Sequence, residues 1–238
     1  MNKLTNILLV LLLIAVIFLG GAVFLLWQKE SAPTIPVSSQ SATSQSSTSH
    51  AAQSGTGPAE NTDQAAELSC SVQLGALRIV QGEEFALQDG NESDCQISCE
   101  NGIYTVSVNT TRSAPVVVSV PKDAFFQQAT FTTWGGALTA ENLAVRDLHT
   151  TCEKGAIQFS GRVEGTIELD HQQGATTLQL EGNQADFNYQ VSYQLGYVQI
   201  GVQTFAGVKG SHSIDNGSGK TIHANCAMGS VRVLFSQA

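Results

Sequence analysis

Residues 136–154 read GALTAENLAVRDLHTTCEK, residues 155–173 read GAIQFSGRVEGTIELDHQQ, and Gly174-Ala175 follow. The Gly-Ala pair thus returns every 19 residues, and Gly210-Ser211 and Gly229-Ser230 are separated by the same step. A small pair at a fixed period, followed by short runs of alternating apolar and polar residues, is typical of a corner in a stacked β-repeat. The sequence therefore predicts a single-stranded β-solenoid with rungs of about 19 residues.

Alternation of apolar and polar residues elsewhere supports an all-β fold. The longest alternating run extends from Phe187 to Tyr197, and its phase changes after Gly196, which indicates a turn or bulge. After residue 27 no window of similar length shows the 3.6-residue apolar stripe of a helix. A β-sandwich with evenly spaced hairpins is the alternative architecture.

The N-terminal region contains one segment long enough to cross a membrane. Residues 7–27, ILLVLLLIAVIFLGGAVFLLW, form 21 residues without a charge, and about 20 apolar residues span the hydrocarbon layer. A cleaved signal peptide is the rival interpretation, but its apolar region is usually about 7–15 residues long. We expect a transmembrane signal anchor at 7–27, preceded by a short cytoplasmic tail at 1–6.

Residues 28–66 are expected to be a disordered Ser/Thr-rich linker, and residues 67–238 the folded β-domain. From Ser31 to Ala66 the linker has nine Ser and five Thr, and it contains no Lys or Arg. Such a stretch has too little apolar surface to offset the entropy of ordering. Lys3 favours a cytoplasmic N-terminus, Lys29 opposes it, and the Ser/Thr-rich stalk favours an extracellular C-terminal domain. The predicted location is the cell membrane, with a single pass.

The charge balance excludes one class of partner. The whole chain has a net charge of −9, and from Glu67 onward nine Lys or Arg face seventeen Asp or Glu. Nucleic acid is not expected as a partner, because phosphate binding needs a basic face. The expected partners are the membrane, through the N-terminal helix, and a cell-envelope polymer or surface protein.

The order of features over residues 68–235 resembles the bacterial cell-surface family named "putative adhesin", a β-solenoid family of unassigned function. The resemblance is carried by five short segments: a strand pair at 72–80 and 82–87, a strand after Asn-Gly at 101–106, a valine-rich strand ending in proline at 116–121, and a last rung at 229–235. It implies a surface β-solenoid. Members with an N-terminal anchor resemble accessory proteins of Gram-positive envelope-stress loci.

The five cysteines leave the disulfide question open. A disulfide among Cys70, Cys95 and Cys99 and structural free thiols are both compatible with an extracellular domain. Cys152 and Cys226 each precede a repeat glycine by three residues, so they are expected at equivalent corners. Their separation corresponds to about four rungs, or ~19 Å at ~4.8 Å per rung, which is too far for a disulfide.

Candidate catalytic and metal-binding residues are few. His171 and Asp170 are adjacent at a corner, but a metal site needs three or four converging ligands. Glu153, Glu164, Glu168 and Asp170 suggest paired carboxylates of the kind glycosidases use, and solvated surface charge is the simpler interpretation. Nucleophile-elbow, zincin and phosphate-loop motifs are absent. We expect no catalytic, cofactor-binding or metal-binding residues and no cofactor.

Three tyrosines in one alternating segment indicate either packing in the interior or binding at the surface. Tyr189, Tyr193 and Tyr197 share the phase of Val191 and Leu195, so they are expected inside, with a sugar-stacking strip as the alternative. The sequence predicts a non-catalytic surface binding or adhesion module, or an envelope-stress accessory protein. The alternatives are a structural solenoid that polymerises end to end and a carbohydrate-active β-helix enzyme.

The anchor leads to the first testable expectation. The mature protein should retain residues 7–27 and fractionate with membranes, and protease added to intact cells should release the domain by cutting within residues 31–66. Edman sequencing of the mature protein and a protease-accessibility assay measure this. A mature N-terminus near Ser31 with free protein in the medium, or protection until cells are lysed, would contradict the expectation.

Overall fold

The computed structural model describes residues 66–236, which form seventeen β-strands and one short 3₁₀ turn, Gln184–Asp186. The predicted all-β class is confirmed. The first strand begins at Ala66, which the sequence had assigned to the end of the linker. The predicted tail and anchor, and the linker up to residue 65, lie outside the described residues.

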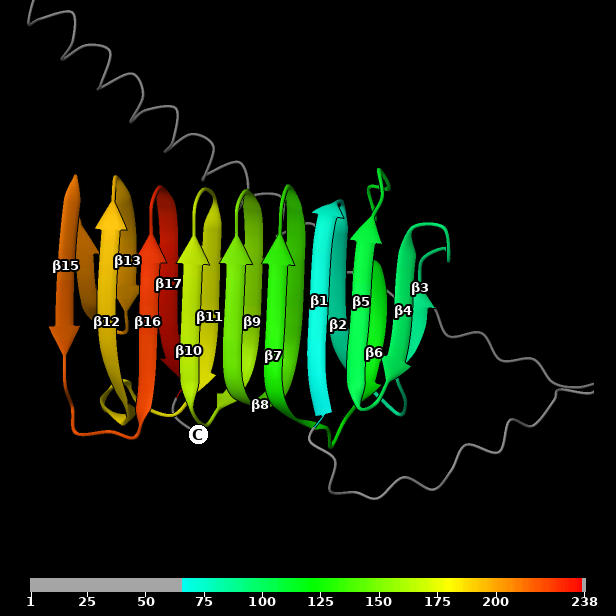
Figure 1. Cartoon of the computed structure of the whole chain (residues 1–238), viewed down its shortest axis with the longest axis horizontal. Helices are drawn as coiled ribbons and strands as arrows, with labels where there is room; N and C mark the ends of the chain where they lie inside the picture. Colours follow the sequence, from blue (N-terminus) through cyan, green and yellow to red (C-terminus); the bar gives the residue numbers. More distant parts are fainter. Residues whose placement is uncertain (1–65, 237–238) are drawn as a thin grey trace, which may run out of the picture. The chain divides into compact units, whose positions relative to one another are not determined.

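The strands form two layers with a shared apolar interior (Figure 1). The first layer contains, in order of hydrogen-bonded neighbours, β4 (Cys95–Glu100), β5 (Ile103–Asn109), β1 (Ala66–Leu74), β7 (Phe125–Thr133), the second part of β8 (Gly136–Cys152), β10 (Thr166–His171), β16 (Lys220–Cys226), β12 (Phe187–Gln194) and β15 (Lys209–Ile214). The second layer contains β3 (Ala86–Asp89), β6 (Val116–Pro121), β2 (Ala76–Gly82), the first part of β8, β9 (Gly155–Val163), β11 (Ala175–Glu181), β17 (Gly229–Ser236), β13 (Gly196–Ile200) and β14 (Gln203–Ala206).

Pairing is parallel inside each layer and antiparallel at both ends. Strands β5 and β12 are the outermost parallel strands of the first layer, and β4 and β15 pair with them in antiparallel fashion. Strands β3 and β14 do the same in the second layer. The antiparallel strands therefore cover both ends of the parallel stack, so that no parallel strand presents a free edge there.

The 19-residue step is confirmed as the register between three consecutive units. In the second layer Gly136 pairs with Gly155, and Ala156 pairs with Ala175. In the first layer Cys152 pairs with His171, which lies 19 residues further on. Because residues one repeat apart lie directly beside each other, side chains of equivalent positions form continuous rows across the strands.

Glycine is required at these corners for two reasons. Gly155 and Gly174 have φ values of 111° and 124°, a region that residues with a Cβ rarely adopt. A Cβ on Gly155 would also overlap the carbonyl oxygen of Gly136, and a Cβ on Gly174 would overlap that of Gly155. The backbone conformation at both positions therefore favours glycine.

The prediction that Gly210 and Gly229, also 19 residues apart, occupy equivalent positions in stacked units was wrong. Gly210 of β15 pairs with Tyr193 of β12 in antiparallel fashion, whereas Gly229 of β17 pairs with Gly196 of β13 in parallel fashion. The chain advances from β10 and β11 to β12 and β13, continues through β14 beside β13 and β15 beside β12, and returns to place β16 and β17 in between. The N-terminal strands show the same arrangement, because β1 lies between β5 and β7, and β2 lies between β6 and β8.

Two local predictions need correction. The strand expected over 72–80 is divided at Gly75, whose φ of 95° and close approach to the carbonyl oxygen of Thr110 mark the corner between β1 and β2. The phase change near Gly196 is present, but Leu195 itself has a φ of 44° and is exposed. Tyr189 and Tyr193 are buried as expected, whereas Tyr197, after the corner, is only half-buried.

The glycine corner provides a stability test. Gly174→Val should lower the free energy of unfolding of the unit 58–238 by about 1–3 kcal/mol, because it combines a strained φ with a backbone overlap. Gln172→Val, at an exposed position on the same turn, should cost under about 0.5 kcal/mol. Urea unfolding with unchanged m values measures both. Equal midpoints for the two variants would contradict the role assigned to the glycine.

Candidate ligand-binding groove

Two rows of polar side chains cross the outward face of the first layer, because residues two apart on a strand point the same way. Glu168 pairs with both His149 and His223, and this register sets the first row. Across β8, β10, β16 and β12 the first row contains His149, Glu168, His223 and Gln190. Across the same strands and β15 the second row contains Thr151, Asp170, Asn225, Ser192 and Ser211.

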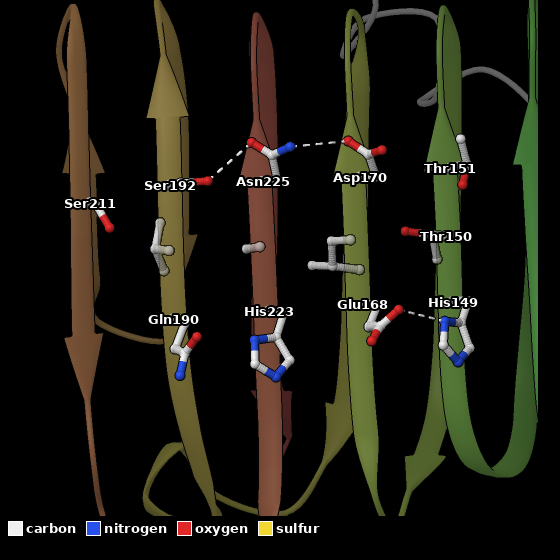
Figure 2. Close-up of a pocket in the computed structure, with 13 residues that line it drawn as sticks. His149, Thr150, Thr151, Glu168, Asp170, Gln190, Ser192, Ser211, His223 and Asn225 are labelled. Carbon is white, nitrogen blue, oxygen red and sulfur yellow. Dashed lines mark hydrogen bonds and ion pairs between the residues drawn. The ribbon is translucent and has the colours of Figure 1, made fainter.

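A groove of about 480 Å³ lies between the two rows (Figure 2). Its floor is the sheet itself, at the residues that separate the rows: Thr150, Leu169, Ala224 and Val191. These four side chains are buried in the interior, so the groove is shallow and its walls are the outward polar side chains. The groove runs across the strands, along the direction in which the units stack.

Hydrogen bonds fix part of the second row. The hydroxyl of Ser192 donates to Oδ1 of Asn225 at 3.0 Å, and Nδ2 of Asn225 donates to Oδ1 of Asp170 at 3.2 Å. This chain, visible in Figure 2, sets the orientation of the amide and leaves one proton of Nδ2 available to a ligand. The second row is therefore partly preorganised.

The first row contains one imidazole–carboxylate contact and two side chains that are available for binding. Nδ1 of His149 lies 2.8 Å from Oε2 of Glu168. Within the described residues, the side chains of His223 and Gln190 have no recorded hydrogen bond. An imidazole and an amide without partners offer both donors and acceptors toward the groove.

The charged side chains of the groove are acidic, and two imidazoles lie beside them. Glu168 and Asp170 contribute carboxylates, and none of the residues that line the groove, all within the described domain, is Lys or Arg. Sequence reasoning had singled out these two carboxylates but missed His149, His223 and Asn225. A polar-apolar-polar triplet, as in residues 168–170 and 223–225, predicts that His223 and Asn225 face outward, but it does not show which strands lie beside them.

The four carboxylates proposed from the sequence do not come together as a catalytic pair. Glu168 and Asp170 share the groove, but Glu164 forms an ion pair with Arg162 at 3.3 Å, and Glu153 lies in the turn between β8 and β9. Each groove carboxylate already has a neighbouring donor, His149 for Glu168 and Asn225 for Asp170.

The outward face of the second layer has a different character. Its register aligns longer side chains in one row: Arg78, Thr139, Gln158, Thr177, Arg232 and Gln199. Arg78 makes two hydrogen bonds of 2.9 Å to Glu141, and Arg232 lies over the ring of Tyr197. Gln158 and Thr177 are side by side on this face, away from the groove, which makes them suitable control positions.

A row of buried residues lies at the corner that ends the first layer. Cys152 pairs with His171, and His171 pairs with Cys226, so the equivalence of these corner positions is confirmed. The distance expected between the two cysteines was wrong, because β16 returns beside β10 and leaves two strand steps, about 10 Å, instead of four. Both thiols are free and buried, and burial raises the pKa of each.

The other cysteines are also free. Cys70 pairs with Val106 of β5, and Cys95 and Cys99 lie on β4, on the far side of β5. Two strand steps, about 10 Å, separate β1 from β4, which exceeds the reach of a disulfide. Burial raises the pKa of Cys70 and of Cys95.

His171 points to the interior and away from its neighbour Asp170, as adjacent residues on a strand must. These two side chains therefore do not form the metal site considered from the sequence. Nδ1 of His171 lies 3.1 Å from the hydroxyl of Thr176, which occupies a position held by Ile157 and Val231 in the adjacent strands. The two polar residues thus satisfy each other within an apolar interior, although Nε2 of His171 has no recorded partner in the described domain.

The described residues contain neither a metal-binding cluster nor a membrane-spanning helix. Within residues 66–236, no three His, Cys, Asp or Glu side chains are grouped so that they could hold a metal ion. The same range contains no helix long and apolar enough to span a membrane.

Comparisons with known proteins found similarity to solved structures. No family model matches the chain, and no curated protein matches it. A crystal structure described as a putative cell adhesion protein from Clostridium sporogenes is similar over 73% of this chain and 93% of that one, with 13% sequence identity and a TM-score of 0.41.

The buried imidazole predicts how stability depends on pH. Burial lowers the pKa of His171 below its ordinary value of 6.5, so below about pH 6.5 the unfolded chain takes up a proton that the folded domain does not. Below that pH, the free energy of unfolding should decrease as the pH decreases, by at most about 1.4 kcal/mol per pH unit for one proton. The loss should level off below the folded-state pKa.

His171→Thr supplies the control, because threonine occupies the equivalent corner at Thr133. The variant should lose stability less steeply between pH 7 and pH 5 in urea unfolding, since the other titrating groups are common to both proteins. Identical acid slopes would show that His171 does not titrate on unfolding.

Proposed function

We propose that this protein is a membrane-anchored, extracytoplasmic β-solenoid that acts by binding a component of the cell envelope at the groove. The observation that carries the proposal is the pair of polar rows, in which preorganised and unpartnered side chains line one open face. Sites of this kind recognise ligands through a few well-placed polar groups.

The solenoid assignment is supported by the strand pairing. Units 19 residues apart lie side by side in parallel register in both layers. Hairpins of a β-sandwich would give antiparallel neighbours throughout, and here antiparallel pairing is limited to the end strands β3, β4, β14 and β15. The same end strands favour a discrete domain over end-to-end polymerisation.

Location and family are supported by the sequence. The uncharged segment 7–27 and the Ser/Thr-rich linker suit a domain held away from a membrane surface. The order of strands and glycine corners over 68–235 resembles the surface adhesin family introduced above. An adhesion role or an accessory role in the envelope are both consistent with a tethered binding domain.

A binding role is preferred to catalysis because of the way the groove carboxylates are held. Glu168 and Asp170 extend from one strand with their neighbouring donors beside them, instead of facing each other across a ligand. An enzyme with paired carboxylates needs the two groups on opposite sides of the scissile bond.

The proposal predicts groove-dependent binding to envelopes. The full chain in mild detergent should sediment with envelopes isolated from its own bacterium, and Asp170→Ala combined with Asn225→Ala should weaken this binding about tenfold or more, because it removes a charged acceptor and a fixed amide. The control is Gln158→Ala combined with Thr177→Ala on the opposite face, which should bind as the unaltered protein does. Equal binding by all three proteins, or no binding at all, would contradict the proposal.

A further inference from the structure

We infer that the groove binds a linear, uncharged polysaccharide whose chain runs across β8, β10, β16, β12 and β15. This inference rests on the proposed function and names the class of ligand.

The dimensions fit one extended polymer chain. The groove crosses five neighbouring strands, which at about 4.8 Å per step gives a length of roughly 19 Å. The rows that form its walls are two residues apart along each strand, or about 7 Å. A channel that is long, narrow and open along its top suits a chain that continues beyond both ends, and Figure 2 shows the two rows on either side of it.

The lining favours hydroxyl groups as ligand atoms. Carboxylates accept hydrogen bonds from hydroxyls, while amides and imidazoles both donate and accept. The fixed amide of Asn225 can bind a hydroxyl without first losing side-chain freedom, which reduces the entropic cost of association. His223 and Gln190, beside each other in the first row, add groups with no competing partner in the described domain.

The charge of the groove argues against a polyanion as its ligand, and the pairing of its strands argues against a peptide. A polyanion would face Glu168 and Asp170 with no Lys or Arg among the lining residues to neutralise it. A peptide would normally add to the free edge of a sheet, but the floor strands β10, β16 and β12 each have hydrogen-bonded neighbours on both sides. The groove also offers no exposed apolar side chain to anchor a peptide.

The rows continue toward the other end of the domain with shorter side chains. Thr130 and Thr132 on β7 pair with His149 and Thr151, and Ser69 and Ser71 on β1 pair with Thr130 and Thr132. The register thus provides further hydroxyl positions in line with the groove. Affinity is therefore expected to rise with the length of the saccharide, as successive sugars reach successive rungs.

The experiment measures binding of the full chain in mild detergent to insoluble neutral polysaccharides (cellulose, chitin and starch) and to their soluble oligosaccharides of increasing length. At least one neutral polysaccharide should bind, with longer oligosaccharides binding more tightly. Asn225→Ala combined with Asp170→Ala should weaken that binding about tenfold or more, whereas Gln158→Ala combined with Thr177→Ala should leave it unchanged. Unchanged urea midpoints establish that the exposed substitutions leave the fold intact.

Competition and envelope pretreatment separate this inference from the proposed function. Soluble oligosaccharides of the polysaccharide that binds should displace the protein from envelopes, while prior digestion of the envelopes with protease should not abolish binding. Groove-dependent binding that these oligosaccharides do not displace and that is lost on protease digestion would overturn the polysaccharide inference and leave the proposed function standing, as would binding to polyphosphate instead of neutral glycans. Absence of binding to any envelope preparation would overturn both.

Discussion

At the turns that lead into the second layer, successive backbones pass too close together to admit a side chain. Gly155 lies against the carbonyl oxygen of Gly136, Gly174 against that of Gly155, and Gly229 against that of Gly174. Hydrogen bonds complete the contact, as where the amide of Ser230 donates to the carbonyl oxygen of Gly174 at 3.0 Å. This close approach fixes the register between units, and a slip of one residue would turn every buried side chain outward.

Both faces of the sheet depend on that register. Inside, it aligns apolar side chains into rows, among which the buried imidazole of His171 lies beside the hydroxyl of Thr176 of the same unit. Outside, it places Asp170 beside Asn225 and Glu168 beside His149, although the chain separates the first two by 55 residues. The groove is thus a product of backbone alignment, and no single segment contains it.

The sequence predicted what is local and regular. The glycine corners, the strand alternation and the 19-residue step are visible because each unit repeats the same short-range rules, and the structure confirms them between Gly136 and Gly174. The positions of outward polar residues such as Glu168 could also be predicted from alternation alone.

What the sequence did not reveal is which units become neighbours near the ends. The return of β16 and β17 into the stack depends on long-range pairing, which has no periodic signal. For this reason the Gly210 to Gly229 step was misleading, and the distance from Cys152 to Cys226 was overestimated. The same return brings His223 and Asn225 into the groove, so those two residues could not have been placed in advance.

The position of the terminal strands also restricts how a domain of this kind can change its length. Strands β1 and β2 at one end, and β16 and β17 at the other, already have hydrogen-bonded neighbours on both sides. A duplicated segment appended to either terminus would find no free edge beside the strands that it continues. Between Gly136 and Gly174, however, sequence neighbours are also spatial neighbours, so a 19-residue duplication there inserts one complete rung. Each such insertion would move the two capped ends apart by about 4.8 Å and lengthen the outward polar rows by one position. Divergence in the size of this domain is therefore expected to occur by internal duplication at its centre, with both ends retained.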